Sequence, residues 1–310
     1  MTIIDIILDA MERRILFKTI EIIEVGLRDG LQREKTPIAT SDKITMIHQL
    51  VDAGIRALQV TSFVHPKTVP QMADAEAVCL GIEKKEGIIY SGLVLNMKGL
   101  ERAYDAGLRH VDMSLSASDS HSRKNANQSL REALDGFAAM VKKARELGLS
   151  VRAGVQCAFG YYEADVTQEI VLDIVKSQLD LGIDSLALAD STGMANPRQI
   201  KTMLHAIKPL IGETPLILHL HDTRGMGLAN VVAAIETGCT RFDTAFGGMG
   251  GCNFIPEALG NIATEDTVNM LHDMGYETGI DIAKVAQVSR TLQTIIGQEL
   301  PGKMYQLLGQ

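Results

Sequence analysis

The chain has 310 residues, of which 46% are hydrophobic and 22% are charged. This composition is typical of a globular protein with ample material for a large core. A formal net charge of −8 argues against nucleic acid or an anionic membrane as the principal partner. The four cysteines are widely spaced and form no C-x-x-C pair, which predicts reduced thiols and a cytoplasmic location.

Short apolar or β-branched runs alternate along the chain with longer segments of helical periodicity. The runs that predict strands are residues 21–26, 57–61, 88–94, 110–115, 150–156, 185–189, 216–220 and 241–245. The segments that predict helices are 42–53, a segment after Pro70, 98–106, 129–147, 167–181, a segment opened by Pro197, and 257–274. A long polar loop is expected between the fourth strand and residue 129.

Eight strand-then-helix units are typical of an α/β (β/α)8 TIM barrel, and they fit it better than an open doubly wound sheet. Phrases such as AGIRALQV (53–60) and AGLRHVDM (106–113), in which glycine ends a helix before a strand, support the barrel. No linker rich in proline or serine interrupts the chain. We therefore predict one catalytic domain over residues 1–310, with the barrel at about 21–275 and a C-terminal helical cap at about 276–310.

The first 18 residues predict a helical arm that covers the barrel bottom or a neighbouring subunit. Asp5, Asp9 and Glu12 interrupt its apolar positions, and no basic segment with a small-residue cleavage site is present, so a targeting peptide is not expected. No run approaches the roughly 18 apolar residues of a membrane span. We expect a soluble protein without a membrane partner, and exposed barrel helices favour a homo-oligomer.

His219 and His221 are two residues apart on the predicted seventh strand, so their side chains share one face. Two imidazoles inside a buried strand are costly unless they bind something, and histidine is the commonest metal ligand. The H-x-H pattern alone is equally compatible with a hydrogen-bonded pair of core histidines. Its position favours metal binding, because catalytic residues of a barrel gather where the strands end.

Other polar side chains lie in or just after the predicted strands. They are Arg28, Asp29, Gln32, Ser62, His65, Lys67, Ser114, Ser116, Ser118, Arg152, Gln156, Asp190 and Asn261. Asp29 stands beside a glycine, where a simple role in a turn is a serious alternative. Two imidazoles and a carboxylate at converging strand ends nevertheless suit a divalent cation, with Mg²⁺ or Mn²⁺ favoured over Zn²⁺.

The glycine-rich segment 247–252 has two interpretations. A phosphate cradle after the last strands is common in barrels, and a mobile lid on a glycine hinge is the other possibility. Cys252 at its end favours the lid, since a thiol above a metal can exchange protons. The alternative for Cys252 is an incidental small apolar residue.

Six motifs taken in order resemble those of a known family. The segment VGLRDGLQ (25–32) resembles the first-strand signature of the DRE-TIM metallolyase superfamily. The segments TSFVHPK (61–67), SASD (116–119), LHLHDT (218–223), GMGGC (248–252) and GNIATED (260–266) are similar to the hydroxymethylglutaryl-CoA lyase branch. Each motif is weak alone, but the ordered set covers nearly the whole chain from about residue 21.

The resemblance implies a divalent cation held by four side chains: Asp29, His219, His221 and Asn261. It implies that Arg28 stabilises the enolate oxygen, that Cys252 is the acid/base on the loop, and that Asp190 lies near the substrate hydroxyl. Lys35 would help to hold the substrate or CoA, and further substrate contacts are predicted at Gln32, Ser62 and Arg152. The implied reaction cleaves a tertiary 3-hydroxyacyl-CoA, such as hydroxymethylglutaryl-CoA, to acetyl-CoA and a keto acid such as acetoacetate.

Several positions depart from the branch. Gln59 stands where its members usually have glutamate, Gly154 occupies an aromatic position, and residues 253–257 replace a Pro-Tyr-Ala segment. These departures surround the acyl group, so citramalyl-CoA, which would give pyruvate, is an alternative substrate. A condensing synthase of the same superfamily is a second alternative. A biotin-dependent carboxyltransferase would need a lysine in strand five, and a non-enzymatic metal-binding or acyl-CoA-binding module would not need Arg28 or Cys252.

Overall fold

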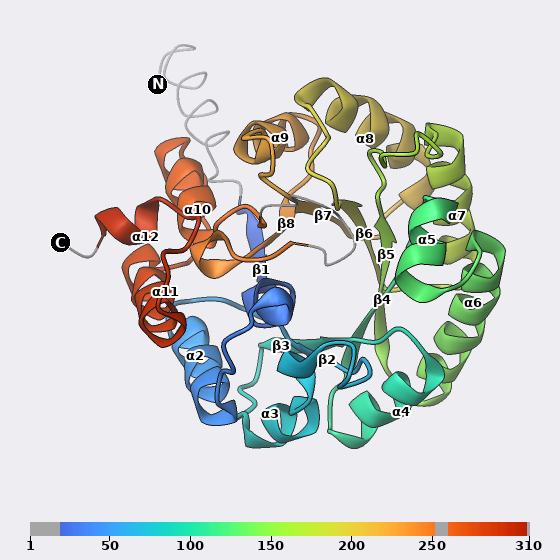
Figure 1. Cartoon of the computed structure of the whole chain (residues 1–310). Coiled ribbons are helices and arrows are strands. Elements are labelled where there is room, and N and C mark those ends of the chain that lie inside the picture. Colours follow the sequence, from blue (N-terminus) through green and yellow to red (C-terminus); the bar gives the residue numbers. More distant parts are fainter. Residues whose placement is uncertain (1–18, 252–259, 309–310) are drawn as a thin grey trace, which may run out of the picture.

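A computed structural model of the chain describes residues 19–251 and 260–308, so the predicted N-terminal arm lies outside the described residues. Within them, eight parallel strands close into a barrel in which β1 pairs with β8 (Figure 1). The strands are β1 (Glu21–Glu24), β2 (Ala57–Ser62), β3 (Ile89–Leu93), β4 (His110–Ser116), β5 (Ser150–Gln156), β6 (Ser185–Asp190), β7 (Leu216–Leu220) and β8 (Arg241–Thr244). The predicted TIM barrel is confirmed, and each predicted strand lies within about two residues of an observed one.

Helices surround the barrel (Figure 1). They are α2 (Thr40–Asp52), α3 (Ala75–Gly81), α4 (Met97–Asp105), α5 (Asp119–Ala126), α6 (Leu130–Glu146), α7 (Gln168–Asp180), α8 (Pro197–Ile211), α9 (Gly227–Glu236), α10 (Thr264–Asp273), α11 (Ile282–Ile296) and α12 (Met304–Leu307). Four short turns of other helix types are η1 (Gly26–Gly30), η2 (Leu31–Arg33), η3 (Pro70–Met72) and η4 (Phe246–Gly248). The C-terminal helices α11 and α12 lie outside the strands, beside α10 and α2 (Figure 1).

Helix α5 occupies a segment that the sequence predicts as a loop. Its residues are almost entirely polar, so no apolar face announces it. The Ser118 side chain starts the helix by accepting a hydrogen bond of 2.9 Å from the His121 backbone N–H. A second difference is that α10 begins at Thr264 instead of near residue 257.

The interior of the barrel is not filled along β5. Its outward-facing residues Val151, Ala153 and Val155 are fully buried beneath the helices, whereas inward-facing Arg152 and Gly154 are partly exposed. Barrel interiors are normally packed with bulky branched side chains. The hydrophobic core therefore lies between the strands and the helices, and two separate cavities lie along the inner side of β5.

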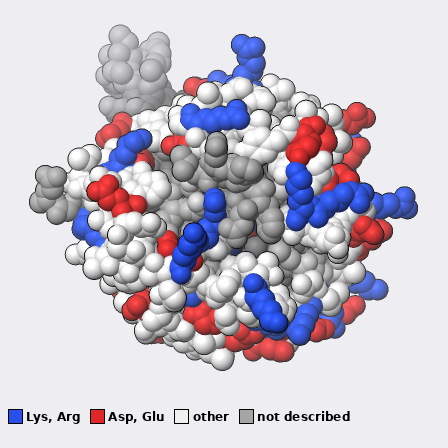
Figure 2. Space-filling model, viewed as in Figure 1, with Lys and Arg blue, Asp and Glu red and all other residues white. Residues whose placement is uncertain are grey.

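On the face shown in Figure 2, basic and acidic side chains are interspersed around the barrel opening. This distribution fits a surface with a modest negative net charge. Among the described helices, none combines the length and the apolar character needed to cross a membrane.

Candidate metal centre and active-site pocket

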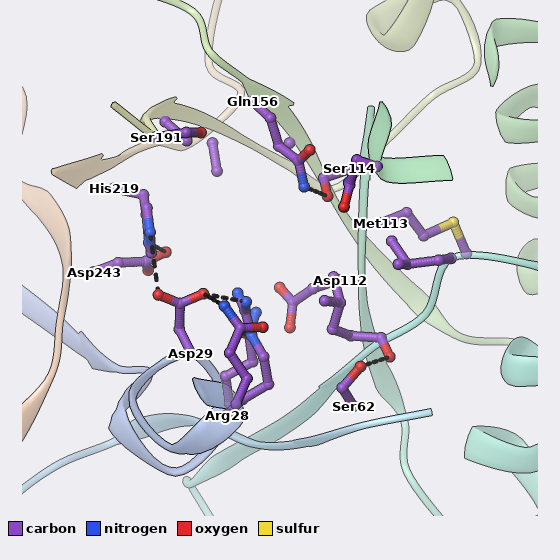
Figure 3. Close-up of a pocket in the computed structure, with 18 of the residues that line it drawn as sticks. Arg28, Asp29, Ser62, Asp112, Met113, Ser114, Gln156, Ser191, His219 and Asp243 are labelled. Atoms are coloured by element: carbon purple, nitrogen blue, oxygen red, sulfur yellow. Dashed lines mark hydrogen bonds and ion pairs between the residues drawn. The ribbon is translucent and has the colours of Figure 1, made fainter. Parts of the chain in front are cut away.

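A pocket opens at the carboxyl ends of the strands, where a barrel places its catalytic residues. Figure 3 shows Asp29 and His219 on one side of this pocket, with Ser114 and Gln156 across from them. Residues from β1 to β8 and their loops line it: Arg28, Asp29, Gln32, Gln59, Ser62, Leu93, Asp112, Ser114, Arg152, Gly154, Gln156, Ala187, Ala189, Ser191, His219, His221 and Asp243. Most of the predicted site residues thus share one cavity.

The turn after β1 directs Asp29 into the pocket. Residues 26–30 form a single wide helical turn, in which the Asp29 N–H donates to the Val25 carbonyl at 2.7 Å. Gly26 is required at its start, because a Cβ there would lie 2.6 Å from the Phe246 ring. The Arg-Asp-Gly turn therefore has a tightly packed base and exposes its two charged side chains to the cavity.

Asp29, His219 and His221 form a buried group in which three candidate ligand atoms lie within 4.8 Å of one another. The two Nε2 atoms are 3.1 Å apart, and each is 3.9 Å from Asp29 Oδ2. Two ligands at right angles on an ion with bonds of about 2.1 Å would be separated by about 3.0 Å. The spacing of the imidazoles therefore fits a shared divalent cation.

Asn261 joins the same group from beyond β8. Its Nδ2 donates to Asp29 Oδ2 at 2.8 Å and to the Met249 carbonyl at 2.9 Å. Its Oδ1 is buried and has no hydrogen-bond partner among the described residues. A buried amide oxygen without a partner is costly unless a ligand binds it, so Asn261 fits a fourth position of the cation site.

The protonation states of these groups suit cation binding. Burial and the neighbouring His219 lower the pKa of His221 to about 4, so its imidazole is neutral at pH 7. Burial raises the pKa of Asp29, but Arg28 and the two histidines outweigh it and leave the pKa at about 2. Neutral imidazoles and an ionised carboxylate are the forms in which these side chains bind metals.

Asp243 on β8 supports the centre, although the sequence analysis did not single it out. Its Oδ2 lies 3.1 Å from His219 Nδ1, which directs Nε2 of that ring toward Asp29 and His221. Arg152 bridges Asp243, at 2.7 Å, and Asp112. Carboxylates commonly orient metal-binding histidines in this way. A charged residue in the middle of a buried strand was the available signal, since it requires a partner.

We call Asp29, His219, His221 and Asn261 the cation group. Arg28 lies beside it. Its Nε donates to the Gln59 side-chain oxygen, and its Nη1 forms an ion pair with Asp29. Only 12% of its side chain is exposed, so a cationic guanidinium is held at the edge of the pocket in a largely desolvated place. Such a fixed cation can stabilise an oxyanion that develops during a reaction.

Of the four predicted substrate contacts, three line the pocket and one does not. Gln32 lines the pocket and bonds to Asp29 and to the Gly251 carbonyl, both at 3.1 Å. Ser62, at the end of the neighbouring strand β2, also lines the pocket. Arg152 forms the floor through its two ion pairs. Lys35 is exposed and lies outside the lining of the pocket.

Asp190 is buried at the end of β6, and its carboxylate is not among the groups that line the pocket. It accepts hydrogen bonds of 3.0 Å from the backbone N–H groups of Met194 and Ala195 and so shapes the turn before α8. Burial raises the pKa of Asp190 to about 6 against these bonds. Cys252 lies outside the described residues.

The glycine-rich segment packs directly on the cation group. A Cβ at Gly250 would lie 2.2 Å from Asn261 Nδ2 and 3.1 Å from Asp29 Oδ2, and the backbone there has a φ of +128°. Only glycine fits this backbone and this close approach. The segment after β8 is thus built against the ligands of the centre.

Curated relatives resemble the chain over most of its length. A hydroxymethylglutaryl-CoA lyase of Bacillus subtilis is 41% identical over 94% of this chain and 97% of its own. The mitochondrial enzyme of Mus musculus is 39% identical, covering 93% of this chain and 89% of its own. A cytoplasmic 3-hydroxy-3-methylglutaryl-CoA lyase of Rattus norvegicus is 38% identical, covering 93% and 84%. The relatives thus include mitochondrial and cytoplasmic proteins.

Solved structures give the same result. The HMG-CoA lyase of Bacillus subtilis superposes with a TM-score of 0.91 at 40% identity, covering 94% of this chain and 99% of its own. An HMG-CoA lyase from Acinetobacter baumannii, in complex with coenzyme A and 3-methylmalate, has a TM-score of 0.89 at 40% identity, covering 93% and 94%. The HMGL-like family model matches residues 19–292. The chain therefore belongs to the HMGL-like family.

Proposed function

We propose that the protein is a carbon–carbon lyase that cleaves hydroxymethylglutaryl-CoA to acetyl-CoA and acetoacetate. The observation that carries this proposal is the buried group of Asp29, His219 and His221 beside the Arg28 guanidinium. Relatives named for this reaction, at about 40% identity over more than nine-tenths of the chain, support it. Acyl-CoA is accordingly the proposed partner.

Asp29, His219, His221 and Asn261 would hold the cation. Their carboxylate and amide oxygens suit Mg²⁺ or Mn²⁺, and the two imidazoles also suit Zn²⁺. A divalent cation bound there would acidify the tertiary hydroxyl of the substrate and orient it. Asp243 holds the His219 ring, and Asn261 holds the Asp29 carboxylate, so both ligands stay in position without rearrangement.

Arg28 supplies the second electrostatic element. As the bond between C2 and C3 of the acyl group breaks, negative charge accumulates on the thioester oxygen. The Arg28 guanidinium is already oriented by Gln59 and Asp29, so it stabilises that charge without moving. Cys252 is our candidate for the proton donor to the departing enolate, and Gln32, Ser62 and Lys35 are candidate contacts for substrate or CoA.

Two roles change relative to the sequence prediction. We assign Arg152 to positioning of Asp243, since its Nε and Nη1 already form ion pairs with Asp112 and Asp243. We assign Asp190 to the β6–α8 turn, where its carboxylate accepts two backbone hydrogen bonds. A single catalytic domain, a homo-oligomer and a cytoplasmic location complete the proposal. Cys79, Cys157 and Cys239, the cysteines within the described residues, form no disulfide, which is compatible with that location.

The test is an assay of the purified protein with Mg²⁺ or Mn²⁺ and hydroxymethylglutaryl-CoA, in which acetyl-CoA and acetoacetate are both quantified. We expect metal-dependent release of the two products in equal amounts. Condensation of acetyl-CoA with a keto acid, without any cleavage, would refute the lyase assignment and support a synthase.

A second candidate is cleavage of citramalyl-CoA to acetyl-CoA and pyruvate. The observation that favours it is Gln59, an uncharged partner of Arg28 at a position where the resembling lyases usually carry glutamate. The same assay with citramalyl-CoA decides between them. A kcat/KM for citramalyl-CoA above that for hydroxymethylglutaryl-CoA would select this second function.

A further inference from the structure

One wall of the pocket is made of small side chains. Ser114 on β4, Gly154 on β5 and Ala187 on β6 are register partners on three neighbouring strands and all line the pocket. One level higher, Ala189 on β6 is the register partner of His219. We call these four residues the small-residue wall. It begins on the strand next to the cation group and continues away from it.

The small-residue wall leaves unfilled space inside the barrel. Neighbouring strands are about 4.8 Å apart, so three small residues side by side span about 10 Å. Bulky branched residues normally occupy such a row in a barrel. Here Ser114, Gly154 and Ala189 are partly exposed although they face the interior, so the space in front of them is open to solvent.

The surface of this wall is uncharged. The Ser114 hydroxyl accepts a hydrogen bond of 2.9 Å from Gln156, and the Ser191 hydroxyl accepts one of 3.1 Å from the Cys157 backbone N–H. Arg152, one level below Gly154, is neutralised by two aspartates. A carboxylate facing this wall would lose its hydration without gaining a free cation, whereas an alkyl group would replace water at little cost.

We propose that the small-residue wall is a subsite for a neutral substituent larger than methyl on the hydroxyl-bearing carbon of the substrate. The inference rests on the proposed lyase function and identifies its substrate class as 3-alkyl-3-hydroxyglutaryl-CoA thioesters with an alkyl group of two or more carbons. The position of Ala189 beside His219 carries the argument, because a hydroxyl bound at the cation group brings its own carbon next to the wall.

The reaction is the same for the larger substrate. With an ethyl substituent, the bond between C2 and C3 breaks and its electron pair remains on C2 as the enolate of acetyl-CoA. The hydroxyl oxygen gives up its proton and becomes the keto oxygen of 3-oxopentanoate. One proton is then added to C2, so no oxidant, reductant or further reactant is needed.

The test compares 3-ethyl-3-hydroxyglutaryl-CoA with hydroxymethylglutaryl-CoA on the metal-loaded enzyme. Burial of one additional methylene is worth about a fourfold gain, so we expect the ethyl/methyl ratio of kcat/KM to be about four or higher. Filling the wall with Ala187→Val should lower this ratio by about tenfold or more, because a core site has little tolerance for added volume.

Gly154→Ala is a second filling variant, whose new Cβ would lie 3.0 Å from Ser114 Cβ, and it should lower the ratio in the same direction. Ser150→Val is the matched control, since Ser150 also faces the barrel interior on β5 but lines a separate cavity at the opposite end of the barrel. It should leave the ratio unchanged within about twofold. Thermal melting establishes that each variant is folded.

The outcomes separate this inference from the proposed function. Absence of cleavage of both thioesters refutes the lyase function itself. Cleavage of the methyl substrate with a more than tenfold poorer kcat/KM for the ethyl substrate leaves the lyase function intact and overturns the subsite. An ethyl preference that neither filling variant reduces would also overturn it, because the preference would then arise elsewhere.

Discussion

Buried carboxyl groups contact both ends of the segment 246–251. Asp29 lies at its end, and Glu24 and Glu265 lie at its start, and the charges around them differ. At its end, Asp29 lies beside Gly250 and is surrounded by Arg28 and two imidazoles. At its start, Glu24 accepts a hydrogen bond of 3.1 Å from the Phe246 N–H, and Glu265 accepts from the Gly247 N–H at 3.0 Å. The same stretch of backbone is thus attached to two acidic clusters.

The pKa values of Asp29 and Glu24 are shifted in opposite directions. Among the described residues, no basic side chain bonds to Glu24 or Glu265, whose partners are backbone N–H groups and the hydroxyls of Thr264 and Ser289. Burial raises the pKa of Glu24 to about 8 and raises that of Glu265 as well. Asp29 is ionised and ready for a cation, whereas Glu24 is a neutral anchor at pH 7. Charge pairing, not burial alone, separates the two roles.

The largest expected effect is at the cation group. We predict that His221→Ala removes bound metal and lowers kcat/KM by at least about a thousandfold, because several kcal/mol of transition-state stabilisation depend on the cation. Metal content of the purified variant and turnover of the thioester are the measurements. His205→Ala, at an exposed histidine of α8, is the control and should retain both. Near-normal turnover in His221→Ala would show that the ligand assignment is wrong.

The next effect concerns Arg28, whose role is electrostatic and not ligation. We predict that Arg28→Gln lowers kcat by about a hundredfold or more with metal content unchanged, as when a donor to a developing oxyanion is removed. Steady-state kinetics and metal analysis on the same preparation measure the two quantities. If metal is lost together with activity, Arg28 acts by holding Asp29 and not by stabilising charge.

A substitution of Asp243 tests whether its contact with His219 contributes to metal binding. We predict that Asp243→Asn weakens metal affinity by about tenfold to a hundredfold, since it removes the carboxylate that orients His219. Asp112→Asn is a matched control, because Asp112 pairs with the same Arg152 but does not touch the imidazole. Titration of the metal-free proteins with Mn²⁺ gives both affinities. Equal losses in the two variants would contradict a specific role of Asp243.

The smallest expected effect is at Glu24 and concerns the free energy of unfolding. The pKa of Glu24 is raised from 4.5 to about 8, so the folded protein binds this proton more tightly than the unfolded chain. The stabilisation is complete below about pH 4.5 and is lost progressively as the pH rises toward 8. Glu24→Gln has no such proton and should lack this part of the pH dependence.

Urea unfolding of the wild type and Glu24→Gln at pH 5 and pH 8 measures this difference. The variant should gain stability relative to the wild type at the higher pH and should retain its bound metal. Glu83→Gln, at an exposed position, is the control for loss of one carboxylate. A parallel pH dependence in Glu24→Gln and the wild type would mean that Glu24 is ionised in the fold.

The sequence predicted the barrel well because strands, helices and the glycines between them are local signals. The strands are runs of four to seven residues, and β2, β4, β5, β6 and β8 each follow a helix that ends at a glycine. The same locality explains the failure at α5, whose helical structure depends on the Ser118 cap and not on apolar periodicity. Its polar composition is typical of a loop.

The site was predicted only in part, because its supporting contacts join residues far apart in the chain. Arg152 and Asp243 are separated by 91 positions, and Asn261 and Asp29 by 232. Strand ends predicted that the candidate ligands lie close together, since a barrel brings its strand ends to one rim. The position of a strand end does not predict the direction in which the last side chain points. Asp190 was therefore predicted to face the substrate, although its carboxylate accepts hydrogen bonds from the following turn.

The close contact of Gly250 with Asn261 and Asp29 has an evolutionary consequence. Any side chain at this position would displace Asn261 or Asp29, so a substitution at Gly250 also disturbs the candidate cation site. Ser114, Gly154 and Ala187 lie in register on three other strands, β4, β5 and β6. New substrates are therefore most accessible to this lineage through mutations on β4 to β6, with the chemistry on β1, β7 and β8 left untouched.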